Sequence, residues 1–492
     1  MKCLAYAAAA GLGAVLAATP SAHADLQVDG DRLRVATANI RLVFQGGEIA
    51  EITNRLTGER VSYGLQRKDP LTAMLRLGGT GAPLRSDGWR RGHENAEGRE
   101  AAQTVLRDLT HTVWLNVLLD KDNDDVVVEA WGESSRPGVS GYRLAVRSLD
   151  LTAGSLIVPT KTGLEYKRAD TRSSLRFEYP NHWLAQMLVW QCAEGGVVLY
   201  SRDREDAFKA VTMTRRGDYA DLGVETRANE PWAKQTSVPH AQWRINAYKG
   251  SWQVPASGYR TLMGFLGPRP DVPEKRLWPS QITTVEPVPE VANDEWLREL
   301  AGRRPPARTL LLMGNWAEGG PPDYRMSDQA AGFLARARDR GFFTMVTARC
   351  DRVRSDWPGL PALRDARIHA TAGDGAQDAG TALMNPASSA WRRALIAQLR
   401  QTFGGERPDA LLLVGATYAP LEVDSASGRN GLEGSTALLK DIQAAFPDLV
   451  LASDEVNERV LPYVRLARRL PAGDATAHAL TSYLFGTTLL WF

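Results

Sequence analysis

Residues 308–328 read RTLLLMGNWAEGGPPDYRMSD, and their pattern predicts the fold class of the second half of the chain. It begins with the apolar run 310–313, which is too short for a helix and suits a strand covered on both faces, as in parallel α/β sheets. After a loop rich in Gly and Pro, Ser327 can cap a helix whose apolar side chains share one face. Strand, loop and helix in this order form the repeating unit of α/β barrels and doubly wound sheets. Their functional groups lie in the loops after the strands.

The same unit recurs to the end of the chain. Further buried strands are predicted at residues 342–347, 409–414 and 449–452, with amphipathic helices between them, and two weaker strand patterns lie around Ile368 and Leu480. A complete eight-stranded barrel typically needs about 250 residues, and fewer follow residue 308. We therefore expect residues 308–492 to form a TIM-type (β/α) barrel that is either incomplete or truncated.

The first half of the chain has a different pattern. Residues 25–267 contain many short runs of β-branched and aromatic residues separated by turns rich in Gly, Asn and Asp, such as 113–119 and 126–131 on either side of 121–125. This spacing predicts an antiparallel β-sandwich. Residues 268–307 contain eight of the 27 prolines, which indicates a stiff linker between two domains.

The N-terminus indicates export. Lys2 is followed by a short apolar run that Pro20 and Ser21 interrupt, and residues 22–24 (AHA) fit a cleavage site, so residues 1–24 are predicted to be a signal peptide. No later run approaches the roughly 18 apolar residues that a membrane span needs. We expect a bacterial protein that is periplasmic or extracellular, with no membrane span.

Composition excludes several classes of function. The net charge is +2 without a basic run, which argues against a nucleic-acid partner. The seven histidines are scattered and no phosphate-binding loop is present, so neither a metal site nor a cofactor is predicted. After export the chain keeps Cys192 and Cys350, one in each predicted domain, which are either two buried thiols or an interdomain disulfide.

Several stretches together carry a resemblance to a known family. They are NW at 315–316 with GGPPDY at 319–324, MNPA at 384–387, the strand with acids at 449–458, and, in the first half, 42–59, 179–203 and 250–260. The chain resembles a bacterial glycoside-hydrolase-like family of unassigned function, similar to α-galactosidases and endo-α-N-acetylgalactosaminidases. The resemblance implies a galactose-mutarotase-like β-sandwich followed by a (β/α)8 barrel with two catalytic carboxylates, and a carbohydrate ligand.

One position departs from what the resemblance implies. The strand at 409–414 would be expected to end in a nucleophilic aspartate, but Val414 stands there. The later acidic position corresponds to Asp454, and Glu458 lies one helical turn further on. A valine cannot attack an anomeric carbon or stabilise positive charge there, so the resemblance supports the fold and the substrate class better than it supports turnover.

The candidate site residues follow the predicted strands. Glycoside hydrolysis needs two carboxyl groups, and the candidates are Asp454, Glu458 and Asp424. The predicted substrate contacts lie in the same loops: Trp316, Asp323, Tyr324, Arg349, Asp351 and Asn430. The alternative is that acids fall beside strand ends by chance, or that Asp454 only caps the next helix.

Two functions remain open. The first is an exported glycoside hydrolase-like protein that acts on a poly- or oligosaccharide through the carboxylates of the barrel loops. The second is a catalytically degenerate carbohydrate-binding protein.

Overall fold

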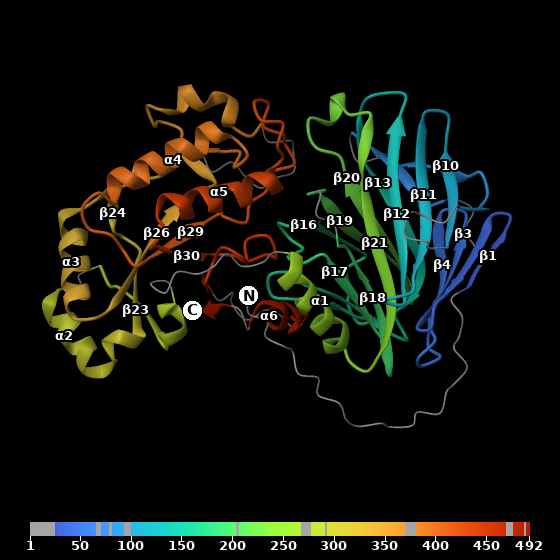
Figure 1. Ribbon diagram of the computed structural model, residues 1–492, viewed down its shortest axis with the longest axis horizontal. Coiled ribbons are helices and arrows are strands. Elements are labelled where there is room, and N and C mark those ends of the chain that lie inside the picture. The colour runs from blue at the N-terminus through green and yellow to red at the C-terminus, as the bar shows by residue number, and fades with distance from the viewer. Residues whose placement is uncertain are drawn as a thin grey trace, which may run out of the picture.

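The computed structural model describes residues 25–64, 70–77, 81–92, 100–202, 206–266, 277–290, 293–369, 380–468, 476–486 and 489–492. The predicted signal peptide, residues 1–24, lies outside the described residues. Two large antiparallel sheets form the first half of the described chain, and a parallel sheet flanked by helices forms the second half (Figure 1).

The described strands of the first half form two sheets, and in each sheet some neighbouring strands are far apart in the chain. The first sheet has eleven strands: β1 (Asp25–Asp29), β2 (Arg32–Ala36), β3 (Ile40–Gln45), β4 (Glu48–Asn54), β5 (Arg60–Tyr63), β6 (Ala73–Arg76), β7 (Gly81–Pro83), β13 (Val139–Asp150), β16 (Ser174–Tyr179), β19 (Lys209–Arg216) and β20 (Tyr219–Arg227). The second sheet has ten: β8 (Arg85–Ser86), β9 (Arg90–Arg91), β10 (Ala101–Arg107), β11 (His111–Asp120), β12 (Asp125–Ser134), β14 (Ser155–Val158), β15 (Leu164–Tyr166), β17 (Met187–Gln191), β18 (Gly195–Tyr200) and β21 (Ser237–Lys249).

One apolar core joins the two antiparallel sheets. Phe44 and Val146 of the first sheet belong to the same buried cluster as Val117 and Trp243 of the second. In the first part of β11, residues 111–116, buried residues alternate with half-buried ones, because successive side chains of a strand point to opposite faces. The prediction of many antiparallel strands in this half is confirmed.

The parallel sheet contains seven strands among the described residues. They are, in spatial order, β22 (Thr284–Pro287), β23 (Thr309–Met313), β26 (Phe343–Arg349), β29 (Ala410–Val414), β30 (Val450–Ser453), β31 (Leu466–Ala467) and β32 (Leu490–Trp491). All four predicted strands are present and lie side by side. The described strands form an open half-barrel with β22 and β32 at its edges.

Both faces of this sheet are covered with apolar side chains, as the run 310–313 predicts. Leu310 belongs to a cluster on one face together with Met345 and Leu412. Leu311 belongs to the larger cluster on the other face, which includes Phe333 of a helix. Burying one such side chain contributes about 1.5–3 kcal/mol, so this two-sided burial fixes the strand in the sheet.

Helices follow the strands in the second half. Most cover the parallel sheet, whereas α1 and α6 lie between the two halves (Figure 1). The helices are α1 (Gln253–Leu266), α2 (Asp294–Arg303), α3 (Asp328–Asp339), α4 (Ser389–Thr402), α5 (Gly431–Ala445) and α6 (Leu480–Phe485). The short 3-10 turns are η1 (Trp232–Lys234), η3 (Trp278–Gln281), η4 (Pro306–Arg308) and η5 (Leu360–Ala366). The remaining strands form two small antiparallel sheets of two strands each: β24 (Ala317–Glu318) with β25 (Arg325–Met326), and β27 (Arg352–Arg354) with β28 (Thr381–Leu383).

Two sequence predictions need correction. The proline-rich segment is not only a linker, because β22 pairs in parallel with β23 and α2 follows it, so this segment supplies the first strand and helix of the half-barrel. Prolines are tolerated there because β22 is an edge strand. The strand predicted around Leu480 is also wrong, since that residue begins α6.

Candidate functional site

The carboxyl ends of the parallel strands bring the main candidate residues to one rim of the half-barrel. Arg349 at the end of β26 lies opposite Val414 at the end of β29. Leu413 lies opposite Ser453 at the end of β30, and Asp454 follows directly. The Arg349–Asp351 segment, Val414 and Asp454 therefore lie at one rim of the half-barrel.

Asp351 is a buried carboxylate held by two arginines. Arg349 donates from Nε and Nη2 to the two carboxylate oxygens over 3.2 and 3.1 Å, and Arg352 donates from Nε to Oδ2 over 3.1 Å. Asp351 is only 7% exposed, whereas the Arg349 side chain is 38% exposed. The paired charges offset the cost of burying Asp351, and the guanidinium of Arg349 remains accessible to a ligand.

Asp454 lies in a different environment. Burial, and next the neighbouring charge of Glu455, raise the pKa of Asp454 to about 6. Its Oδ1 accepts a hydrogen bond from the backbone N–H of Gly415 over 3.1 Å, which partly opposes that shift. Asp454 therefore holds a proton at mildly acidic pH, as a general acid must.

Gly415 allows the two carboxyl groups to approach each other. Its φ is +79°, which favours glycine, and a Cβ at this position would lie 2.4 Å from Cγ of Asp351. Its N–H is the donor to Asp454. Asp351 and Asp454 thus contact the same residue, directly after Val414.

Two predicted ligand contacts are structural instead. Trp316 is only 2% exposed, and its Nε1 donates to the Thr347 carbonyl over 2.8 Å. The ring stacks on Tyr324 at 5.4 Å between centroids, and the Tyr324 hydroxyl accepts from the backbone N–H of Arg349 over 2.6 Å. The apolar packing of the Gly/Pro loop against the helices buries both rings. Their polar atoms bind the backbone of Thr347 and Arg349, so the two side chains hold the end of β26 in place and do not face a ligand.

The long loop after Val414 also differs from the prediction. Asp424 is 4% exposed, and its Oδ2 accepts from the N–H and the hydroxyl of Ser427 over 2.8 and 2.6 Å. Asn430 is 6% exposed and caps α5, forming a capping box with Glu433. The structure contradicts a ligand-facing role for Asp424 and Asn430, because their polar atoms serve a turn and a helix terminus.

Of the remaining candidates, Asp323 is half-buried at the rim. The hydrogen bond and charge of Asp356 raise the pKa of Arg354 most, and the charge of Asp323 raises it further.

The last candidate, Glu458, contacts the antiparallel half. Its two oxygens accept from Gln186 Nε2 over 2.9 Å and from the Tyr259 hydroxyl over 2.6 Å. Through these two partners Glu458 joins the two halves.

Sequence reasoning missed three residues of the rim. Arg352 is the second partner of Asp351, Gly415 holds Asp454, and Lys161 of the antiparallel half forms an ion pair with Glu455, next to Asp454. The glycine after Val414 could have been recognised as a turn position. Lys161 could not, because it is 294 residues from its partner.

The described residues give no indication of a metal or of a membrane span. No group of three or more His, Cys, Asp or Glu side chains in the described ranges is arranged to hold an ion. None of the described helices is long and apolar enough to cross a bilayer. Cys192 and Cys350 are both buried and free, so they are two thiols and do not form the interdomain disulfide that was the alternative.

Comparison with known proteins places the fold. No protein-family profile and no curated protein sequence matches the chain. Among solved structures, the α-N-acetylgalactosaminidase NagBb from Bifidobacterium bifidum, in complex with GalNAc, has a TM-score of 0.69 at 10% identity, covering 93% of this chain and 84% of that chain. The GH36 α-galactosidase AgaB from Geobacillus stearothermophilus has a TM-score of 0.53 at 10% identity, covering 95% and 78%.

The galactosidase domain of the α-galactosidase-sucrose kinase AgaSK is similar to the same degree, with a TM-score of 0.53 at 10% identity over 95% of this chain and 78% of that chain. The resemblance noted in the sequence is confirmed at the level of the fold. The chain has the fold of glycoside hydrolases that include α-galactosidases and an α-N-acetylgalactosaminidase.

Proposed function

We propose that the protein is an exported glycoside hydrolase-like protein that binds a galactose-type glycan at the rim of the half-barrel and cleaves it slowly. In this proposal the antiparallel half is a mutarotase-like β-sandwich and the parallel half is of the TIM-type (β/α) class. The fold of α-galactosidases supports the substrate class. Residues 1–24 support export to the periplasm or the cell exterior.

The observation that carries the proposal is a pair of carboxyl groups in unlike environments. Asp454, with a pKa of about 6, is the general acid that protonates the leaving oxygen. Asp351, ion-paired with Arg349 and Arg352, is the carboxylate that faces the developing positive charge. Two carboxyl groups kept in different protonation states are what glycoside hydrolysis requires.

Two features of the rim make turnover slow. Val414 supplies no carboxylate at the end of β29, and the two arginines that hold Asp351 weaken it as a nucleophile or base. Losing a catalytic carboxylate commonly lowers rates by several powers of ten, roughly 5 kcal/mol or more. These features favour the second candidate function, a glycan-binding protein without turnover, in which the exposed guanidinium of Arg349 binds sugar hydroxyls.

The experiment compares turnover and binding in four proteins. Wild type, Asp454→Asn, Val414→Asp and the loop control Asp365→Asn are assayed on α-linked galactosides and N-acetylgalactosaminides. We expect slow hydrolysis by wild type, no hydrolysis by Asp454→Asn with binding retained, and faster hydrolysis by Val414→Asp. Asp365 is exposed, and its variant should match wild type.

The outcomes separate the two functions. Binding without hydrolysis by wild type would establish the binding function and refute the catalytic role of Asp454. Hydrolysis that Asp454→Asn leaves unchanged would place the catalytic groups elsewhere.

A further inference from the structure

A cavity of about 360 Å³ lies between α1 and the face of the second antiparallel sheet that α1 covers. Its walls come from β18, β21 and α1, and the main residues are Val198, Tyr200, Asn246, Tyr248, Tyr259 and Leu262. None of the rim residues Arg349, Asp351 and Asp454 lines it. The volume lies in the range of pockets that bind small ligands, so this cavity is a site distinct from the rim.

The cavity walls suit the apolar faces of a sugar ring. Three tyrosines contribute to them, and the rings of Tyr200 and Tyr259 meet edge to face at 6.2 Å between centroids. Leu262 and the exposed Val254 extend the apolar surface along α1. Rigid aromatic rings offer large contact areas at a low cost in conformational entropy, and C–H groups of sugars pack against them.

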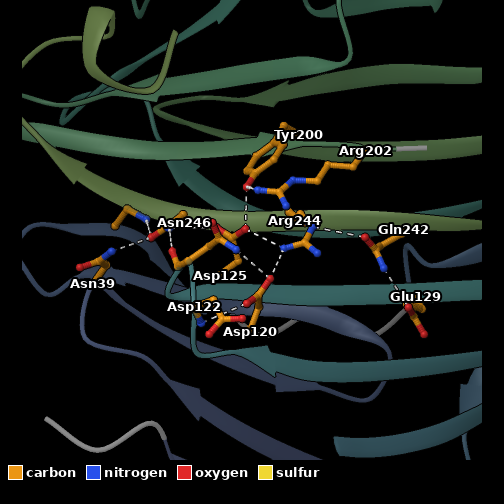
Figure 2. A network of polar contacts seen from close by, with 12 residues as sticks. Asn39, Asp120, Asp122, Asp125, Glu129, Tyr200, Arg202, Gln242, Arg244 and Asn246 are labelled. Atoms are coloured by element: carbon orange, nitrogen blue, oxygen red, sulfur yellow. Dashed lines mark hydrogen bonds and ion pairs between the residues drawn. The ribbon is translucent and has the colours of Figure 1, made fainter. Parts of the chain in front are cut away.

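The polar side of the cavity is already ordered (Figure 2). Asp125 is buried and accepts hydrogen bonds from the Tyr200 hydroxyl over 2.6 Å, from Arg244 Nη1 over 2.9 Å and from Asn246 Nδ2 over 2.9 Å. Arg202 lies over the Tyr200 ring at 5.7 Å and donates to its hydroxyl over 3.4 Å. Because these groups fix one another, a ligand would meet a preorganised wall, and little ordering would oppose binding.

The charges around the cavity balance. Of the residues that line the cavity, Asp125 and Arg202 carry opposite charges, and Arg244, which lies outside the lining, pairs with both Asp125 and Asp120. An acidic sugar would meet no excess positive charge, whereas sugar hydroxyls can both donate and accept along such a wall. The half-buried guanidinium of Arg202 and the amides of Asn123 and Asn246 supply the polar groups of the wall.

We propose that this cavity is a second carbohydrate-binding site, which takes a neutral sugar residue of one or two rings. The site binds independently of any chemistry at the rim. It places a glycan on the antiparallel half, where α1 joins the two halves through the Tyr259 contact to Glu458.

Two glycines of α1 provide the test. A Cβ at Gly258 or at Gly264 would meet no atom within 4 Å, so both positions have room for a larger side chain. Gly258 lines the cavity and Gly264 does not, so Gly258→Phe fills it and Gly264→Phe is the matched control with the same effect on helix propensity. Val254→Trp, at an exposed position on the cavity wall, is a second blocking variant that does not disturb the core.

The measurement is isothermal titration with neutral mono- and disaccharides and the matching uronic acids. All variants carry Arg349→Ala, which removes binding at the rim and keeps failure of this proposal distinct from failure of the proposed function. We expect saturable binding of a neutral sugar that Gly258→Phe and Val254→Trp weaken by about tenfold or more and Gly264→Phe leaves unchanged. Absence of neutral-sugar binding in the Arg349→Ala parent, preference for uronic acids, or full binding by both blocking variants would overturn the proposal.

Discussion

Among single residues, Asp454 makes the folding stability of the protein depend on pH, because its pKa differs between the folded and the unfolded state. Its pKa is about 6 in the folded protein and about 3.9 in an unfolded chain. The folded state therefore holds the proton more tightly, and this contribution to stability is complete below pH 4 and is lost as pH rises through 6.

We accordingly predict that Asp454→Asn is more stable than wild type at pH 7 by roughly 1–2 kcal/mol, after allowance for partial exposure of the carboxyl group. The difference should disappear near pH 4. Urea unfolding of both proteins at pH 4, 5.5 and 7 measures it, with Asp365→Asn as the exposed control. A stability difference that does not change with pH would refute the shifted pKa.

A second residue-scale prediction concerns Trp316. Its buried ring packs on Tyr324 and Phe403, and its N–H is bonded to the Thr347 carbonyl. Trp316→Ala should lower the free energy of unfolding by about 3–5 kcal/mol, as large-to-small core substitutions do, and Trp316→Phe by less. Thermal and urea unfolding provide the measurement. A loss below about 1 kcal/mol for the alanine variant would mean that the ring is not part of the core.

At the scale of elements, the N-terminus of α5 also connects the two halves. The Asn430 side chain accepts from the N–H groups of Leu432 and Glu433 and donates to the Asp206 carbonyl of the antiparallel half over 2.9 Å. The Ser327 side chain, which caps α3, differs from Asn430. Among the described side-chain contacts it only accepts a hydrogen bond from the N–H of Ala330 in its own helix, over 3.1 Å.

We predict that Ser327→Ala costs about 1 kcal/mol of stability and Asn430→Ala about 2 kcal/mol, because the second variant loses a cap and a contact between the halves. Urea unfolding of the two variants measures the difference. Glycan binding should be unaffected by Asn430→Ala, in contrast to a ligand-binding role. Equal stability losses would show that the Asp206 contact contributes nothing.

Sequence patterns predicted elements better than they predicted side-chain roles. Short apolar runs such as 310–313 and 410–414 predicted buried strands, because they are too short for helices and their side chains cover both faces of a sheet. The strands β31 and β32 have only two residues each, which is too short for a periodic pattern. The prolines around β22 suggested a linker, although this segment forms an edge strand. Polar residues in loops were the least predictable, because a ligand contact and a helix cap, such as Asn430, call for the same side chains.

At the scale of the whole molecule, contacts between the halves shape the rim. Glu458 accepts from Gln186 and Tyr259, Asn181 exchanges two hydrogen bonds with the backbone of Ala419, and Lys161 pairs with Glu455. Each contact joins residues more than 190 positions apart, so sequence reasoning could not pair them. The antiparallel half is therefore part of the environment of Asp454.

We predict that Glu458→Ala lowers stability by about 2–3 kcal/mol, since it leaves the buried Tyr259 hydroxyl and the buried Gln186 amide without their acceptor. Glu406→Ala, which breaks a partly exposed ion pair with Arg338, should cost below about 1 kcal/mol. Urea unfolding followed by tryptophan fluorescence compares the two variants. Similar small losses would mean that the halves associate without this carboxylate.

The decisive experiment is the pH dependence of wild-type turnover on an α-linked galactoside, because it reports the protonation state of the proposed acid. We predict slow turnover that is highest below pH 6 and falls as Asp454 loses its proton, with an apparent pKa of about 6. Asp454→Asn should abolish this activity at every pH while the glycan still binds. Turnover that stays constant from pH 5 to pH 8, or that survives in Asp454→Asn, would contradict it.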